Sequence, residues 1–387
     1  MLDRAFAHLG PEEAVIYLKK GYGGLQQAAS RRLPGAKGEM FHSRSLEHEV
    51  VEKGQSALVL DALTDERFAA AESILSSGVR SLIAAPLLGP AGCEGMIVLS
   101  SRIHLRRFSE PDLELLTALA SVAALRIRNL ALAEEGARRR ELEKEMAIAR
   151  QIQLTLLPEH LPEIPGYAVF ACNDASRAVS GDFYEFQKRD ETDEEVIVIA
   201  DVSGKGMAAS LLAASFDALL MGPIEVGHTT DLICSRVSRR LYLKTPPERY
   251  VTAFICALDP HSGRLSYTNA GHNAGLLVRA DGSVQRLEAN GLPIGLFPAV
   301  DYQRAEVMLQ PGDLVMLYTD GITEAANPKG DEFGLDRLQA VVCQYAREPL
   351  VALAVAIETA VEVFADGTPF GDDRTQVMLR REPESAS

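Results

Sequence analysis

Four short motifs in the C-terminal half of the chain each place an aspartate beside or close to a glycine. Carboxylate oxygens are ligands that Mg²⁺ and Mn²⁺ prefer in proteins, and a pair of such ions can promote in-line attack of water on a phosphoryl group. Carboxylates that arrive from four separate segments are therefore candidates for a two-metal site. The motifs are Ser180-Gly181-Asp182-Phe183-Tyr184, Ala200-Asp201-Val202-Ser203-Gly204-Lys205-Gly206, Tyr318-Thr319-Asp320-Gly321 and Gly371-Asp372-Asp373-Arg374-Thr375.

Strand-like segments are expected to position these aspartates. The apolar residues 196–200 lead directly into Asp201. The apolar residues 314–318 likewise precede Asp320, and residues 180–184 lie where a further strand should begin. An acidic side chain at the end of an apolar strand is costly to bury without a partner. Any one motif is also compatible with an ordinary turn, because Asp and Gly are common turn residues, but four of them together favour a metal site.

The composition limits the kind of protein. A chain of 387 residues is long enough for two domains, and its hydrophobic content of 47% and charged content of 24% are ordinary for a globular protein. The formal net charge of -15 argues against a nucleic-acid partner, because like charges repel. We expect no apolar run of this sequence to cross a bilayer, and the N-terminus lacks a signal-peptide pattern. We therefore expect no membrane partner.

The five cysteines are odd in number, scattered, and form no Cys-x-x-Cys pair. This pattern is typical of reduced thiols and not of disulfides or zinc ligands. We therefore expect a cytoplasmic protein.

The first 129 residues mix short strands and helices. A helix is expected at residues 45–53, and another begins at Ser109, a good N-cap that is followed by Pro111 in the first turn. Turns are expected at residues 21–24 and 89–92, where glycine and proline gather. Strands are expected at residues 14–18, 25–29, 57–60, 81–87 and 95–99.

This arrangement resembles a GAF domain, a sensor of small ligands or partners with a central antiparallel sheet. The residues that carry the resemblance are the strand at 59–61 followed by residues 65–68, the strand at 81–87, and Phe108-Ser109-Glu110 at the start of the last helix. Cys93 lies in the expected hairpin and is interpreted as an inert thiol, not as a bilin attachment site.

A highly charged helical stretch, residues 130–157, follows this domain, and Pro158 and Pro162 end it. Apolar residues at three- and four-residue steps predict a narrow seam, typical of a parallel two-stranded coiled coil. We therefore expect a homodimer through the GAF-like domain and this linker, although a helix that packs on its own domain is the alternative. Gly136 interrupts the pattern, whose members are Leu142, Met146, Ala149, Ile152 and Leu156.

The remaining residues, from about 147 to 381, resemble the bacterial metal-dependent serine phosphatases that act on anti-sigma-factor antagonists, such as sporulation protein E and the stress-response regulators. This family shares the fold of the type 2C protein phosphatases, two antiparallel sheets packed face to face with helices outside. The resemblance rests on the aspartate motifs, which occur in family order. It also rests on Ile148-Ala149-Arg150-Gln151-Ile152-Gln153, Leu156-Leu157-Pro158, Asn269-Ala270-Gly271-His272-Asn273, Gly295 and Phe333-Gly334.

The resemblance assigns a role to each aspartate. It implies that Asp201 bridges two metal ions, that the carbonyl of Val202 is a further ligand of one ion, and that Asp182 supports the same ion through water. It implies that Asp320 and one residue of the Asp372-Asp373 pair hold the other ion; Asp372 is favoured and Asp373 is the alternative. The departures from the family, Ser180 in place of Gly and Glu185 in place of Asp, touch no implied ligand.

Two further residues are open to more than one interpretation. His272, in a tight turn, is either a general acid or a residue that fixes the loop by hydrogen bonds. Lys205 either contacts substrate phosphate or is a solvated loop lysine. No nucleophilic side chain is needed. The sequence holds one Cys-x5-Arg spacing, Cys234 to Arg240, which falls inside the helix expected at residues 231–243 and is therefore not interpreted as the loop of a cysteine phosphatase.

Together these observations predict an α+β protein with a GAF-like sensor at residues 1–129, a helical linker at 130–160 and a type 2C-like α-β-β-α sandwich at 161–387. The expected activity is that of a protein-serine/threonine phosphatase that uses two Mn²⁺ or Mg²⁺ ions. The resemblance implies a phosphorylated anti-anti-sigma protein with a STAS-type domain as substrate. Residues 142–157 and 208–220 are hypothesised to be helices that switch the metal site. The alternatives are a binding module without turnover and a phosphomonoesterase for small molecules.

Overall fold

The computed structural model describes residues 2–19, 24–34, 43–62, 65, 78–90, 92–102, 107–155, 157–176 and 179–383. The chain divides into two compact units, Met1–Glu141 and Leu142–Ser387. The predicted turn at residues 21–24, the GAF-like segment 65–68, the turn residue Ala91 and the seam residue Leu156 lie wholly or partly outside the described residues.

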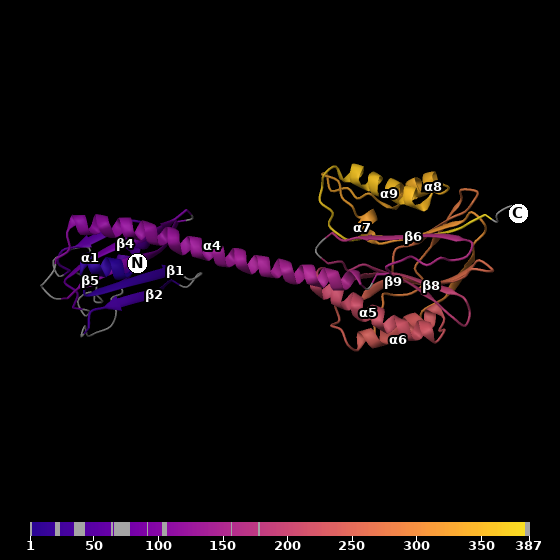
Figure 1. Cartoon of the computed structure of the whole chain (residues 1–387), viewed down its shortest axis with the longest axis horizontal. Helices are drawn as coiled ribbons and strands as arrows, with labels where there is room; N and C mark the ends of the chain where they lie inside the picture. The colour runs from indigo at the N-terminus through magenta and orange to yellow at the C-terminus, as the bar shows by residue number, and fades with distance from the viewer. Residues whose placement is uncertain are drawn as a thin grey trace. The chain divides into compact units, whose positions relative to one another are not determined.

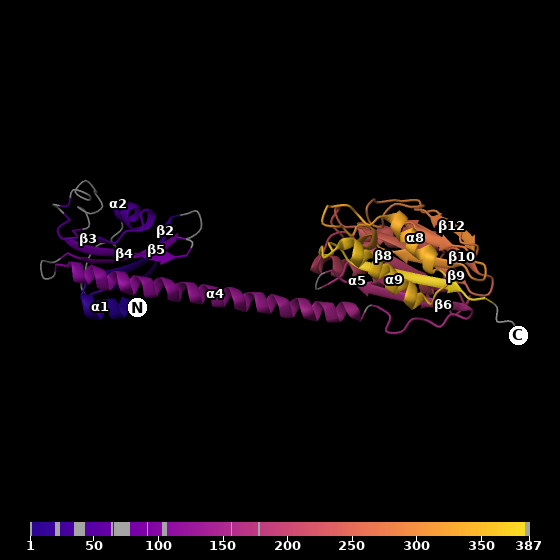
Figure 2. The same ribbon diagram turned by 90° about the horizontal axis from the view of Figure 1, so that it is seen from above.

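The N-terminal unit is built on one antiparallel sheet with the strand order β2-β1-β5-β4-β3. Figure 2 shows α1 and α4 beneath this sheet and α2 above it. The predicted strands are confirmed, each within a few residues of its expected ends. The elements are α1 (Leu2–Leu9), β1 (Glu13–Lys19), β2 (Leu25–Arg32), α2 (Arg44–Glu47), the π-helical turn η1 (His48–Glu52), β3 (Ala57–Val59), β4 (Ser81–Gly89), β5 (Gly92–Ser101) and α4 (Glu110–Leu154).

Strand β4 shows why the sheet lies between two helical layers. Successive side chains of a strand point to opposite faces, and in β4 both sets are apolar and buried. Leu82 and Ala84 pack in the cluster that includes Leu46 of α2, whereas Ile83 and Ala85 pack in the cluster that includes α1 and the first turns of α4. A nearly continuous apolar run is what a strand covered on both faces requires.

The helix α4 begins as predicted but is longer than either segment expected from the sequence. The hydroxyl and the amide of Ser109 donate hydrogen bonds to Oδ2 of Asp112, at 2.8 and 2.9 Å, and so cap its first turn. The helix then continues without a break to Leu154, through Gly136. The last helix of the GAF-like domain and the predicted linker are therefore one element.

Two of the described helices are long and apolar enough to cross a membrane by length and composition alone, within Glu110–Gln151 and Met207–Glu225. By length and composition, the expectation that the chain has no segment able to cross a bilayer is therefore wrong. Packing gives a different reason for the apolar character of both helices. The first turns of α4 bury Leu116, Ala120 and Ala123 in the N-terminal unit, and the second helix is buried along one face in the C-terminal unit.

The C-terminal unit is the predicted α-β-β-α sandwich. One antiparallel sheet has the order β13-β10-β9-β8-β7 and the other has the order β12-β11-β14-β15-β6. Figure 1 shows α5 and α6 outside the first sheet and α8 and α9 outside the second. The strands are β6 (Tyr167–Asp174), β7 (Phe183–Lys188), β8 (Glu195–Val202), β9 (Val251–Asp259), β10 (Arg264–Ala270), β11 (Gly275–Val278), β12 (Val284–Leu287), β13 (Ala305–Met308), β14 (Leu314–Tyr318) and β15 (Arg374–Arg381).

Of the helices α5 to α9, three match expected segments, with ends that differ by one to five residues. The expected helices at residues 208–220 and 231–243 are present, and the one expected from residue 347 starts a few residues later. Two short helices after β14 were not predicted. The helices are α5 (Met207–Glu225), α6 (Thr230–Tyr242), α7 (Asp320–Thr323), α8 (Leu335–Tyr345) and α9 (Leu350–Ala365).

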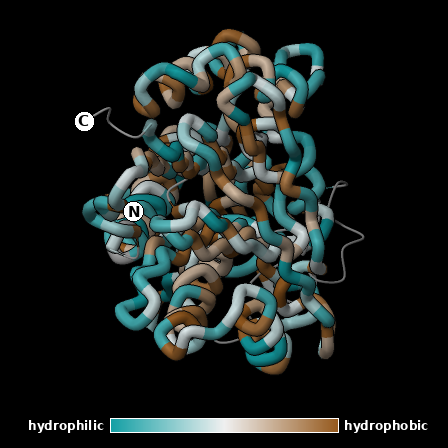
Figure 3. Tube along the Cα trace, turned by 90° about the vertical axis from the view of Figure 1, so that its right-hand side faces the viewer, coloured by the Kyte–Doolittle hydropathy of each residue, from teal (hydrophilic) through white to brown (hydrophobic). Residues whose placement is uncertain are grey.

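Three apolar layers hold the sandwich together. One lies between the first sheet and α5 and α6, one between the two sheets, and one between the second sheet and α7, α8 and α9. In the middle layer the ring of Phe254 stacks on Tyr267, with 5.1 Å between centroids. Figure 3 shows short hydrophobic and hydrophilic stretches that alternate along the trace.

Candidate active site

Strand alternation directs Asp201 into the space between the two sheets. In β8, Val198 and Ala200 face α5, whereas Ile197 and Ile199 face the second sheet. Asp201 continues the second set, because side chains two residues apart share a face. Burial raises the pKa of Asp201 to about 7, and the nearby carboxylates of Asp320, Asp372 and Asp373 add to this effect. The carboxylates predicted from four segments are thus close enough to act on one another.

Asp182 lies deeper, between the ends of the two sheets. Its Oδ2 accepts hydrogen bonds from the hydroxyls of Thr319 and Thr375, both at 2.6 Å. Thr319 follows β14 and Thr375 lies in β15, and both belong to the second sheet, whereas Asp182 precedes β7 of the first. Burial, followed by the charge of Asp201, raises the pKa of Asp182 well above its ordinary value.

The loop that carries Asp182 is held by side chains at each of three successive backbone amides. The amide of Ser180 donates to Oε1 of Gln153 at 2.8 Å, and Nε2 of Gln153 donates back to the carbonyl of Ser180. The amide of Gly181 donates to Oδ2 of Asp373 at 2.7 Å. The amide of Asp182 donates to the hydroxyl of Ser180 at 3.0 Å. Because Gln153 belongs to the last turn of α4, this helix contacts the loop directly.

The neighbours Asp372 and Asp373 have different surroundings. Both oxygens of Asp373 accept bonds from backbone amides, Oδ1 from Ser176 and Oδ2 from Gly181, each at 2.7 Å. The carboxylate of Asp372 is partly exposed, and its Oδ2 lies 2.7 Å from Nζ of Lys205. Asp373 therefore shapes the loop around Asp182, whereas Asp372 faces a cation.

Lys205 is a cation in direct contact with this group of carboxylates. Its Nζ also donates to the carbonyl of Gly371 at 2.6 Å, so that it ties the loop after β8 to the loop before β15. Its charge lowers the pKa of Asp201 and of Asp320, against the larger upward effect of burial on both. In this structure the exposed side chain of Lys205 contacts protein oxygens, and its contact with substrate phosphate stays a prediction.

Asp320 begins α7 directly after β14 and Thr319. Burial and then the charge of Asp372 raise its pKa. The next residue must be glycine, because a Cβ on Gly321 would collide with the carbonyl oxygen of Asp373. This close approach brings the backbone of α7 against the Asp372-Asp373 loop.

The oxygen atoms at this end of the sandwich fit a hard divalent cation. They are carboxylates and backbone carbonyls, with no sulfur among them. A Cβ built on Gly181 would lie 3.2 Å from the carbonyl oxygen of Val202 and 3.7 Å from Oδ1 of Asp201, so that both oxygens border the space beside this glycine. Among the described residues, however, no three His, Cys, Asp or Glu side chains converge closely enough to form a closed ligand sphere.

His272 is buried behind this group of carboxylates. Its Nδ1 lies 3.0 Å from the hydroxyl of Thr252, which in turn is 3.4 Å from the carbonyl of Asp201, and its amide donates to Oδ1 of Asn269 at 2.8 Å. Burial lowers the pKa of His272 to about 4, so that the ring is neutral at neutral pH. These contacts match a residue that fixes the loop.

Three residues of the site were not singled out from the sequence. Thr319 and Thr375 stand inside the aspartate motifs, and strand alternation could have shown that both face the neighbouring sheet. Gln153 had only a weak signal, because a glutamine near the end of an exposed charged helix usually has no structural partner.

Comparison with known proteins identifies both units. The model of the family "Stage II sporulation protein E (SpoIIE)" matches residues 192–382, which include Asp201, Asp320 and Asp372. The GAF domain model matches residues 1–127. The chain joins a GAF domain to a serine phosphatase domain of the SpoIIE family. This family is of the type 2C kind and is metal-dependent. The predicted boundaries at residues 129 and 160 stay predictions, because α4 runs through both units.

Relatives with known names support this assignment. The chain is 29% identical over 278 residues to protein IcfG of Synechocystis sp. This match covers 64% of this chain and 42% of IcfG. It is also 29% identical over 191 residues to the phosphoserine phosphatase RsbU of Bacillus subtilis. That match covers 49% of this chain and 56% of RsbU. The chain thus spans about half the length of the curated relatives that it matches.

Among solved structures, the PP2C domain of SiaA from Pseudomonas aeruginosa superposes with a TM-score of 0.56 at 25% identity. The match covers 63% of this chain and 98% of the SiaA domain. The whole of that phosphatase domain therefore has a counterpart in this chain.

The contact between Gln153 and the Asp182 loop leads to a first prediction. Gln153→Ala leaves the amide of Ser180 without its partner, and an unpaired buried donor costs about 1–3 kcal/mol. We expect roughly tenfold weaker binding of Mn²⁺, measured by calorimetry, since about 1.4 kcal/mol corresponds to a factor of ten. Gln151→Ala, at an exposed position in the same turn, is the control. Equal Mn²⁺ affinity in the two variants would show that the contact does not position the loop.

The raised pKa of Asp201 leads to a second prediction. Because this pKa is about 7 in the folded chain and its ordinary value is 3.8, the metal-free protein loses stability as the pH rises from about 4 to about 7. Asp201→Asn removes this loss, and we expect a higher melting temperature than for the native chain at neutral pH without metal. The difference should vanish at acidic pH, where Asp201 is protonated in both states. A variant that melts lower than the native chain at neutral pH would contradict this expectation.

Proposed function

We propose that the chain is a metal-dependent phosphoserine phosphatase. The observation that carries this proposal is the approach of Asp201, Asp320 and Asp372 at one end of the sandwich, near enough that the charges of Asp320 and Asp372 raise the pKa of Asp201 and the charge of Asp372 raises the pKa of Asp320. Like charges are held together in this way at sites that bind cations. The family match supports the reaction class, since RsbU and a second similar protein of Bacillus subtilis, RsbP, which is 26% identical over 240 residues, are named phosphoserine phosphatases.

Each residue would have a distinct part in holding two Mn²⁺ or Mg²⁺ ions. Asp201 would contact both ions, and the carbonyl of Val202 would be a ligand of one. Asp320 and Asp372 would hold the other, because both oxygens of Asp373 are engaged by backbone amides. Asp182 would act on the first ion through water, since Thr319 and Thr375 already bond one of its oxygens. When bound, the ions would neutralise the phosphate and supply an activated water.

The protein's own groups would then orient the substrate. Lys205 is tied to Asp372 and to the carbonyl of Gly371 by contacts of 2.7 and 2.6 Å. Once Asp372 is occupied as a ligand, the ammonium group would be available for a phosphate oxygen. His272 is neutral and hydrogen-bonded to Thr252, so it would position the strand that carries Asp201 and would not donate a proton.

We further propose that the substrate is a phosphorylated anti-anti-sigma protein with a STAS-type domain, and that the GAF domain controls the activity. What supports this is the similarity to RsbU and RsbP, not a residue of this chain. Control would pass through the end of α4, whose Gln153 bonds the Asp182 loop, and through α5, which follows Asp201 by a few residues. The protein would act in the cytoplasm.

Two other functions make different predictions. A binding module would bind Mn²⁺ but hydrolyse no phosphate ester. A phosphomonoesterase for small molecules would act on free phosphoserine as fast as on a phosphoserine peptide. The raised pKa values around Asp201 favour catalysis over a binding module, because such values cluster at catalytic sites. They do not distinguish a protein phosphatase from a phosphomonoesterase for small molecules.

The direct test is hydrolysis of p-nitrophenyl phosphate with and without Mn²⁺. Asp201→Asn should lower the rate by at least about a thousandfold, because the loss of a shared ligand forfeits several kcal/mol of transition-state stabilisation. Asp301→Asn, in an exposed loop, is the control and should keep the native rate. Turnover that persists without metal or in Asp201→Asn would contradict the proposal. Binding of Mn²⁺ without turnover in the native chain would favour the binding module.

We also propose that the chain forms a homodimer through the GAF domain and α4. In the structure Leu142 of the predicted seam is 53% exposed, and Met146 and Ala149 are half-buried. Leu142→Asp should convert a dimer to a monomer in sedimentation velocity, because it places a charge in an apolar seam. Ala147→Asp adds the same charge at an exposed position outside the seam and should leave the dimer intact. A native chain that sediments as a monomer would overturn this proposal.

A further inference from the structure

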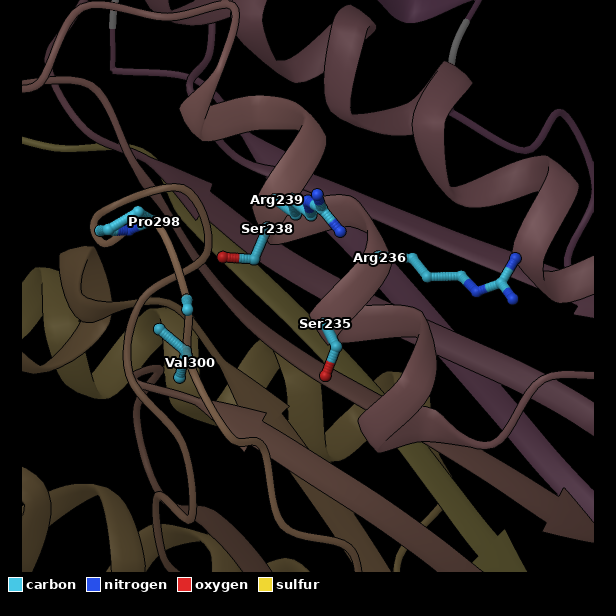
Figure 4. Close-up of a pocket in the computed structure, with 7 residues that line it drawn as sticks. Ser235, Arg236, Ser238, Arg239, Pro298 and Val300 are labelled. Carbon is cyan, nitrogen blue, oxygen red and sulfur yellow. The ribbon is translucent and has the colours of Figure 1, made fainter.

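The helix α6 has an unusual row of three arginines on its outer side, Arg236, Arg239 and Arg240. Two adjoining hollows of about 480 and 420 Å³ run along it, and Arg236 and Arg239 line both. Figure 4 shows the first hollow between α6 and the loop that carries Pro298 and Val300. We refer to the two hollows together as the arginine groove. Its other lining residues are Ser235, Ser238, Leu243 and Ala299.

These three arginines differ from the others of the C-terminal unit. Within the part of the chain that the structure describes, none of their three guanidinium groups has a hydrogen bond or an ion pair, whereas the side chain of every other described arginine of this unit has an interaction partner. Arg279, for example, bonds Asp313 at 2.7 Å, and Arg249 bonds the carbonyl of Ser203 at 2.7 Å. The remaining paired arginines are Arg150, Arg189, Arg264, Arg286, Arg304, Arg337, Arg347, Arg374, Arg380 and Arg381.

Charge makes this concentration more notable. The whole chain carries a formal charge of -15, yet the arginine groove gathers three guanidinium groups within two turns of one helix. Arg239 and Arg240 lie in the last turn, where a positive charge also interacts favourably with the helix dipole. Arg236 lies a turn earlier, and the helix dipole does not account for it.

Hydrogen bonds connect the arginine groove to the carboxylate site. The hydroxyl of Ser238 accepts from the amide of Gly295 at 3.0 Å. The preceding residue, Ile294, exchanges two backbone hydrogen bonds with Val251, at 2.7 and 2.9 Å, and Val251 is the partner of Val202 in the sheet. Neighbouring strands lie about 5 Å apart, so the groove begins on the order of 15 Å from the backbone of Asp201.

We propose that the arginine groove binds an acidic segment of the phosphoprotein substrate while the phosphoserine lies at the carboxylate site. This inference rests on the proposed phosphatase function. Guanidinium groups form paired, charge-assisted hydrogen bonds with carboxylates, and three of them in a row suit several carboxylates along an extended chain. A strand advances about 3.3 Å per residue, which places the acidic residues roughly four to six positions from the phosphoserine. Pro298, Ala299 and Val300 would line the apolar side of the segment.

The test compares two phosphoserine peptides that differ only in charge. One carries glutamates at the fourth to sixth positions on both sides of the phosphoserine, and the other carries glutamines there. With Mn²⁺ at low ionic strength, the native chain should show a kcat/KM at least about tenfold higher for the acidic peptide, as expected for charged pairs across an interface. The triple variant R236Q/R239Q/R240Q should lose this preference and keep the native rate on p-nitrophenyl phosphate.

A matched control separates the groove from general charge. The variant R264Q/R286Q/R304Q removes the same three charges from partly exposed arginines that already pair with carboxylates. It should retain the preference for the acidic peptide. Equal loss in the two triple variants, or a native chain that does not distinguish the peptides, would overturn the inference. Melting temperatures of both variants check that each is folded.

Peptide binding distinguishes this inference from the proposed catalysis. Fluorescence anisotropy with the acidic phosphopeptide needs no turnover, and the difference in affinity between the two triple variants reports the contribution of the groove. Weaker binding by R236Q/R239Q/R240Q than by the control variant supports the arginine groove even if the native chain hydrolyses nothing. Turnover of p-nitrophenyl phosphate together with equal peptide binding by both variants would leave the phosphatase intact and reject the groove.

Discussion

The hydrogen bonds of one buried carboxylate hold the two sheets together at the end where the acidic motifs meet. Asp182 enters from the first sheet, and the hydroxyls of Thr319 and Thr375 reach it from the second at 2.6 Å. A buried carboxylate is costly unless polar groups surround it, so the two threonines fix the spacing of the sheets here. Asp201 lies near the end of β8 and Asp320 at the start of α7, so the spacing of the sheets also fixes the distance between these two carboxylates.

Charge is the second constraint on this region. Burial and mutual repulsion raise the pKa values of Asp182, Asp201 and Asp320. The ammonium of Lys205 offsets part of this repulsion through its contact with Asp372. A site in which negative charges outnumber the positive one is unfavourable by itself and gains from any added cation. Apolar side chains pack on both faces of each sheet, and their burial offsets the free-energy cost of these repelling carboxylates.

The sequence indicated the parts of this site that depend on local pattern. Apolar strands that end in aspartate, as at Asp201, are visible because strand periodicity and turn residues are local properties. The two-sheet architecture followed from family resemblance. Contacts such as that of Gln153 with Ser180, or of Asp182 with Thr375, join segments far apart in the chain, and no spacing rule points to them. The helix α8 was missed because its apolar stripe is short, with only Leu338 and Val342 buried.

The partner of Gln153 is a backbone amide and carbonyl, not a side chain. Every amino acid except proline offers both groups, so the bond to α4 does not depend on the side chain of Ser180, whose hydroxyl instead accepts a hydrogen bond from the amide of Asp182. A different sensor upstream would therefore keep this contact with the loop as long as the helix that leads into the phosphatase domain ends with a glutamine at this position. Such a contact suits the exchange of domains during evolution, because it requires one glutamine in the helix and no matching side chain in the loop.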